Sequence, residues 1–180
     1  MNAVLAYVSD SDLRFSGRVR RWRPSRWFLL WMLWATRLGD GWLWFAVGMA
    51  LLAHGGGAHR MFAACALAVA AANVVLVVLK RRVRRTRPCD VLPHSLFEVP
   101  TPRRFPSDRF SFPSGHALNA FAVSSVLALC WPWLAPALAL VAVSVAASRV
   151  VLGLHYVSDV VAGGLFGILL GGLAYVLILG

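Results

Sequence analysis

Long apolar runs separated by short polar stretches dominate the pattern along this chain. A helix needs about 20 mostly apolar residues to cross the hydrocarbon core of a bilayer. Met61–Leu79 meets this length, and the run at 38–54 approaches it. Three further runs follow, at Ala117–Trp131, Trp133–Val151 and Val160–Leu179. The pattern therefore predicts an all-α fold, an integral membrane bundle with five core transmembrane helices.

A shorter apolar segment, Trp27–Ala35, precedes these runs, with Arg26 and Arg37 at its ends. As a helix it would be about 13 Å long, which is too short to cross a bilayer. We interpret it as an amphipathic helix lying in the headgroup region. A sixth, strained span is the alternative. The chain then divides into a basic N-terminal segment, 1–37, and a membrane-embedded domain, 38–180.

Composition excludes a water-soluble protein. Hydrophobic residues make up 59% of the chain, mean hydropathy is +0.70, and only 14% of residues are charged. Such a chain cannot build a polar surface around so much apolar material. No Cys or His spacing indicates a metal site, so we expect neither a metal nor a cofactor. Nucleic acid is not an expected partner.

The charge pattern bears on orientation. The net charge is +11, and on the five-span topology every Lys and Arg except Arg60 falls on one side. Positive residues mark the cytoplasmic side of a membrane protein. We therefore expect the N-terminus and the polar segments 80–116 and 148–159 to face the cytoplasm. A periplasmic orientation is the alternative, and it would need the sixth span.

Three polar strings lie at the ends of the apolar runs. They are Lys80-(x6)-Arg87-Pro88, Pro113-Ser114-Gly115-His116 and Arg149-(x5)-His155-(x3)-Asp159. Because of these positions, all three can meet at one face of the membrane. The question is what chemistry their side chains could perform together.

The cations and the Ser-Gly turn suit a phosphate group. Lys80, Arg87 and Arg149 can neutralise its equatorial oxygens, which is the main requirement of phosphoryl transfer. Arginine does so in a bidentate fashion and lysine as a point charge. Ser114 and Gly115 stand at the start of a predicted helix, where an anion is favoured. We expect both to hydrogen-bond phosphate oxygens.

The two histidines supply the reacting groups. His155 and Asp159 are four residues apart, which predicts that they share one face of a helix. The carboxylate would hold one ring nitrogen and leave the other free to attack phosphorus. His155 is thus the candidate nucleophile, and a phosphohistidine the expected intermediate. His116 is placed to protonate the leaving group and then to activate water as a base.

The three strings resemble the motifs of the type 2 phosphatidic acid phosphatase superfamily, over roughly residues 36–179. The resemblance implies a multi-pass protein of the bacterial inner membrane. It also implies a metal-independent phosphatase that acts on a lipid phosphate. Polyprenyl phosphate or diphosphate, phosphatidylglycerol phosphate, phosphatidate and a lipid A phosphate all remain open as substrates. The rival interpretations are a lipid-to-lipid phosphotransferase and a non-enzymatic lipid-binding or transport protein.

Several residues outside the strings are interpreted as structural. Asn73 is expected to hydrogen-bond a neighbouring helix, and Asp40 to cap a helix. The last turn after Lys80 is read as a basic cluster flanking the membrane, made by Arg81, Arg82, Arg84 and Arg85. The glycines in two successive G-x-x-x-G steps suit close helix packing, within the chain or in a homo-oligomer. They are Gly163, Gly167 and Gly171.

The proline-rich linker Cys89–Phe112 is expected to shape the entrance to the site. It carries three arginines that could read a lipid headgroup or bind anionic lipid: Arg103, Arg104 and Arg109.

Overall fold

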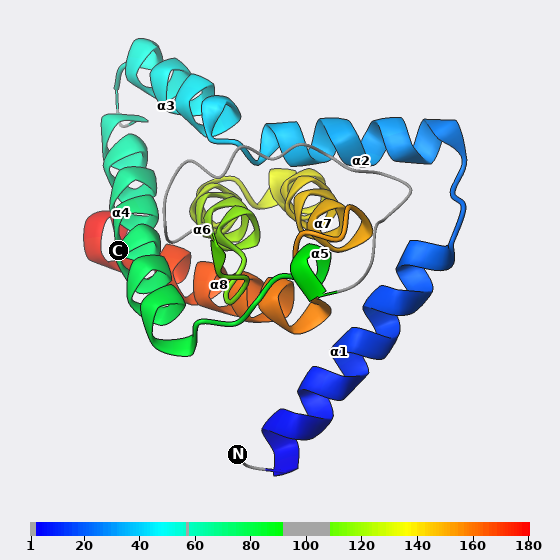
Figure 1. Cartoon of the computed structure of the whole chain (residues 1–180). Helices are drawn as coiled ribbons and strands as arrows, with labels where there is room; N and C mark the ends of the chain where they lie inside the picture. The colour runs from blue at the N-terminus through cyan, green and yellow to red at the C-terminus, as the bar shows by residue number, and fades with distance from the viewer. Residues whose placement is uncertain (1–2, 57, 92–108) are drawn as a thin grey trace.

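The computed structural model describes residues 3–56, 58–91 and 109–180 (Figure 1). Its elements in chain order are α1 (Ala3–Arg21), α2 (Arg26–Leu38), α3 (Trp42–His54), α4 (Ala58–Val83), α5 (Pro88–Val91), α6 (Gly115–Cys130), the short 3-10 helix η2 (Pro132–Leu134), α7 (Ala135–Val151) and α8 (Val157–Leu179). The predicted all-α membrane fold is confirmed.

Helix α6 forms the centre of the bundle, with α4, α7 and α8 packed around it (Figure 1). The contact between α6 and α8 depends on glycine. A Cβ added at Gly163 would lie 2.6 Å from the carbonyl oxygen of Ser114, and Gly167 and Gly171 press equally closely on the α6 backbone. The two G-x-x-x-G steps therefore pack within the chain. They are not available as the oligomer contact that the sequence left open.

Three of the described helical stretches are long and apolar enough to cross a membrane: Ala58–Val83, Pro132–Val151 and Val157–Leu179. Helices α3 and α6 are apolar but shorter. The first span was expected over 38–54, yet α3 begins only at Trp42. The chain turns before it, and Gly41 has a φ of 98°, a left-handed conformation that favours glycine.

The N-terminal segment contains a helix, α1, in addition to the one predicted near Trp27–Ala35. Helix α1 is 19 residues long and contacts α7 and α8. In Figure 1 it passes the end of the bundle at which α8 begins. Helix α2 starts at Ser25, whose hydroxyl accepts a hydrogen bond from the Phe28 N–H at 3.3 Å, and it packs on α7. Its location in the headgroup region stays a prediction.

Candidate active site

Backbone hydrogen bonds bring the three polar strings to one end of the bundle. The N–H of Ser111, just before the second string, donates to the carbonyl of Arg85 in the first, at 2.8 Å. The N–H of Ser114 donates to the carbonyl of Asp159 in the third, at 3.0 Å. Strings that are far apart in the sequence are thus joined by the main chain itself.

The three predicted phosphate-binding cations line one cavity together with both histidines. Lys80, Arg87 and Arg149 are each less than a tenth exposed. Arg149 Nη1 donates to Thr36 Oγ1 at 2.5 Å, and Arg87 Nη1 to the Leu154 carbonyl at 3.4 Å. Three cations at one cavity wall create a positive potential there, which favours an anionic ligand.

His155 lies in the turn between α7 and α8, and the prediction that it shares a helix face with Asp159 is wrong. The N–H groups of Leu154 and His155 both donate to the Arg149 carbonyl, at 2.9 and 3.0 Å. Gly153 makes this turn possible with a φ of 70°. Asp159 sits in the first turn of α8. The two side chains meet because the turn folds back, and helical spacing has no part in it.

The surroundings of His155 suit a nucleophile. Its Nδ1 lies 3.6 Å from Asp159 Oδ2, within ion-pair range, and makes no hydrogen bond to the described residues. Burial lowers the pKa of His155 to about 3, and the nearby charges of Arg149 and Arg87 act in the same direction. The imidazole is therefore neutral at neutral pH, which leaves a ring nitrogen with a free lone pair.

His116 stands at the start of α6 and has a partner that the sequence interpretation missed. Its Nε2 lies 2.9 Å from Asp40 Oδ1, so Asp40 pairs with a histidine, whereas Gly41 occupies the N-cap of α3. The hydrogen bond to His116 holds the pKa of Asp40 below its ordinary value. A Cβ at Gly39 would lie 2.6 Å from the His116 ring, so only glycine leaves room for it.

The Ser-Gly turn contributes differently from what was expected. The Ser114 N–H donates to the Asp159 carbonyl, which leaves the side-chain hydroxyl, and Ser114 is not among the residues that line the cavity. This hydroxyl is fully buried and has no hydrogen-bond partner among the residues described. Gly115 lines the cavity, and a Cβ there would lie 2.9 Å from Leu76. The Leu76 side chain of α4 thus packs closely on the start of α6 at this glycine.

Arg85 was interpreted as one of four membrane-flanking arginines, and for this residue the interpretation is wrong. Its side chain is only 18% exposed, and its guanidinium bonds both Asp159 and Asp12 of α1. Arg81, Arg82 and Arg84 are exposed, as expected of flanking residues. Nothing in the spacing of these four arginines marks one of them as different, because the partner Asp12 lies on a distant helix.

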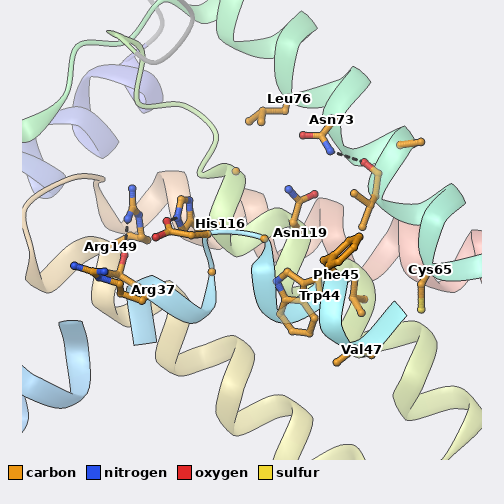
Figure 2. A pocket seen from close by; sticks show the side chains of 18 of the residues that line it. Arg37, Trp44, Phe45, Val47, Cys65, Asn73, Leu76, His116, Asn119 and Arg149 are labelled. Atoms are coloured by element: carbon orange, nitrogen blue, oxygen red, sulfur yellow. Dashed lines mark hydrogen bonds and ion pairs between the residues drawn. The ribbon is translucent and has the colours of Figure 1, made fainter. Parts of the chain in front are cut away.

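The cavity has a volume of about 1130 Å³ and continues from the charged end into an apolar groove between α3, α4 and α6. Figure 2 shows His116 and Arg149 at one end and Phe45, Val47 and Cys65 toward the other. Apolar side chains thus line the groove, and cations and histidines line the charged end.

Two asparagines line the middle of this groove (Figure 2). Asn73 donates to the carbonyl of Val69 in its own helix at 2.8 Å, so the expected bond to a neighbouring helix is wrong. Asn119 Oδ1 is buried, and the structure describes no partner for it. Of the linker arginines, Arg109 is exposed, while Arg103 and Arg104 lie outside the described residues.

Comparison with known proteins finds relatives of this chain. Two curated relatives match about half of the chain. A decaprenylphosphoryl-5-phosphoribose phosphatase of Mycolicibacterium smegmatis is 44% identical over 92 residues, which are 51% of this chain and 46% of that protein. A lipid A 1-phosphatase of Rhizobium etli is 37% identical over 90 residues, 50% of this chain and 38% of that protein. The chain thus matches less than half the length of either relative.

Two crystal structures share the fold. LpxE of Aquifex aeolicus superposes with a TM-score of 0.75 at 23% identity, covering 90% of this chain and 93% of that one. A transmembrane PAP2 type phosphatidylglycerolphosphate phosphatase of Bacillus subtilis has a TM-score of 0.71 at 27% identity, covering 98% and 87%. The family model described as PAP2 superfamily matches residues 61–179, which contain all three strings. The chain therefore belongs to the PAP2 superfamily.

Proposed function

We propose that this protein is a membrane-embedded phosphatase that removes a phosphate from a lipid headgroup, with His155 as the nucleophile. The observation that carries the proposal is the buried His155 beside Asp159, in a cavity wall that also holds three cations. These are the nucleophile, its orienting carboxylate and the charge neutralisation that phosphoryl transfer requires.

The geometry suggests a two-step reaction. Lys80, Arg87 and Arg149 hold the phosphate oxygens while His155 Nε2, the nitrogen turned away from Asp159, attacks phosphorus. A P–N bond forms as the P–O bond to the lipid breaks, and His116 gives its proton to the leaving oxygen. Burial lowers the pKa of His116, and the Asp40 carboxylate opposes this by favouring a proton on the ring. In the second step His116 takes a proton from water, which attacks phosphorus, breaks the P–N bond and releases inorganic phosphate.

The apolar groove supports a lipid substrate, because an acyl or prenyl tail could lie in it while the phosphate reaches the cations. Asn119 would offer a hydrogen bond to a polar group beside that phosphate. The names of the relatives supply the panel to test: decaprenylphosphoryl-5-phosphoribose, lipid A and phosphatidylglycerol phosphate, with phosphatidate and polyprenyl diphosphate added. All of these combine a phosphate with a long apolar tail.

The direct test is phosphate release from this panel by the purified protein in detergent. We expect release from at least one lipid, retained in excess chelator because fixed cations supply the positive charge, and inhibited by vanadate as a mimic of the transition state. A newly phosphorylated lipid in place of free phosphate would indicate the phosphotransferase. Release that depends wholly on a divalent metal, or none from any lipid, would contradict the proposal.

We further propose that the site faces the cytoplasm from the bacterial inner membrane. Cys89 lies beside the site and is exposed, whereas Cys65 is buried. An impermeant thiol reagent added to cells with a permeable outer membrane should spare Cys89. It should label a cysteine placed at His59, an exposed residue at the start of α4, in a Cys89→Ser background. Labelling of Cys89 in intact cells would instead put the site in the periplasm.

A further inference from the structure

The two carboxylate oxygens of Asp159 have different partners. Oδ2 accepts a hydrogen bond from the Tyr156 N–H at 2.8 Å and faces His155 at 3.6 Å. Oδ1 accepts one from Arg85 Nη1 at 2.9 Å. The orientation of the carboxylate behind the nucleophile therefore depends on Arg85, which occupies one of the unassigned x positions of the first string.

Arg85 is itself held by the N-terminal helix. Its Nη2 donates to Asp12 Oδ2 of α1 at 2.8 Å, and Asp12 is buried. Ser158 ties the same groups together, because its hydroxyl bonds Asp12 and its N–H donates to Asp12 Oδ1 at 3.3 Å. The guanidinium also lies 4.0 Å from the ring centroid of Tyr156. Arg85 thus has one fixed geometry.

The charges of this cluster suggest why Asp12 matters. Arg85 paired with Asp159 alone would form a neutral pair, with little negative charge left for the positive charge that develops on His155. With Asp12 included, two carboxylates share one guanidinium, and one negative charge remains. A carboxylate that stabilises an imidazolium is the role of the acid in a catalytic triad.

We propose that Asp12 is a positioning residue for the catalytic centre. It draws Arg85 toward α1, fixes Asp159 and leaves the Asp159 charge available to His155. This inference rests on His155 being the nucleophile. It extends the site to α1, which lies outside the segment that matches the PAP2 family. A helix that looks like a basic N-terminal extension would then belong to the catalytic apparatus.

The alternative is that Asp12 only anchors α1. Asp12→Asn separates the two roles, because asparagine keeps an acceptor for Arg85 and Ser158 but removes the charge. Asp10 is the matched control: it lies on the same helix and pairs with Arg14 at 2.5 Å on an exposed face. Docking of α1 is followed by tryptic cleavage in the exposed Arg21–Arg26 connection.

For Asp12→Asn we expect kcat to fall about tenfold to a hundredfold, the usual effect of losing a charge-assisted hydrogen bond. KM and tryptic cleavage should stay as in the wild type, trapped phosphoenzyme should form more slowly, and Asp10→Asn should behave as the wild type. Equal kcat in the two variants would overturn the inference. So would a change in KM or in cleavage without a change in kcat.

A double-mutant cycle gives the second test. In an Arg85→Gln background, Asp12→Asn should cost little more, because its charge no longer acts through the guanidinium. Arg82→Gln, an exposed arginine of the same helix, is the control. If Arg85→Gln does not accumulate, Arg85→Lys replaces it, since lysine lacks the fork that bridges two carboxylates. Additive effects would contradict the inference. Wild-type protein that releases no phosphate would contradict the proposed function and this inference with it.

Discussion

The two histidines of the site stand in opposite surroundings. His155 is 2% exposed, and its partner Asp159 is fully buried. His116 is 25% exposed, and its partner Asp40 is 54% exposed. The first pair lies within packed protein, and the second opens to water at the α2–α3 turn. A nucleophile must be desolvated and neutral, whereas an acid and base must exchange protons with water. The difference in burial therefore assigns the roles in our proposal.

The largest effect should follow from removing His155, the buried histidine of the two. His155→Ala eliminates the nucleophile, and we expect turnover to fall by about a millionfold, as for the loss of a nucleophile in a triad enzyme. Labelled phosphate should be trapped on the wild type and not on the variant. His59→Ala, at an exposed position at the start of α4, should behave as the wild type. Substantial activity in His155→Ala would exclude the phosphohistidine route.

The loss of rate on removing His116, the more exposed histidine, should be larger for leaving groups that need a proton. His116→Ala should slow a lipid phosphate, whose alkoxide needs a proton, by about a hundredfold to ten thousandfold. An aryl phosphate with a good leaving group should be slowed far less in the first step. The measurement is the burst of alcohol or phenol release. Equal loss for both substrates would mean that His116 does not act as the acid.

Asp40→Asn tests the role of the carboxylate that pairs with His116, the more exposed histidine. Asparagine keeps an acceptor for His116 but loses the charge that favours its protonated form, so kcat should fall about tenfold, mainly for poor leaving groups. The alkaline limb of the pH profile should move to lower pH. Asp10→Asn, on the exposed face of α1, is the control. An unchanged profile would reduce Asp40 to a structural contact.

The smallest effect concerns stability in acid. The pKa of His155 is about 3 in the folded protein against 6.5 for a free histidine. Between these values the unfolded chain binds a proton that the folded chain does not, so stability falls as the pH falls, by about 1.4 kcal/mol per pH unit at most. The lowered pKa of Asp40 affects stability only at a pH below the ordinary aspartate pKa of 3.8. Thermal unfolding of His155→Asn should show a shallower dependence on pH than the wild type.

Sequence reasoning worked best where the signal is local. The three strings predicted one site, and the structure brings Lys80, Arg87, Arg149, His116 and His155 into one cavity. Sequence reasoning failed to predict the partners of Arg85, Asp12 and Asp40, because the position of a charge on one helix does not reveal its partner on another. Asp40 was expected only to cap a helix, whereas its contact with His116 joins positions 76 residues apart.

What the sequence by itself determined is the membrane location, the helical fold and the set of reacting groups. Apolar run length and the spacing of charged residues are short-range properties. The backbone has few alternatives to a helix inside a bilayer, because its polar groups must be hydrogen-bonded within the segment. Only the tertiary structure decided how the groups are held. The turn that places His155 depends on Gly153, the α6–α8 contact on Gly163, and the orientation of Asp159 on a guanidinium shared with α1. These depend on contacts between distant segments, which local patterns do not encode.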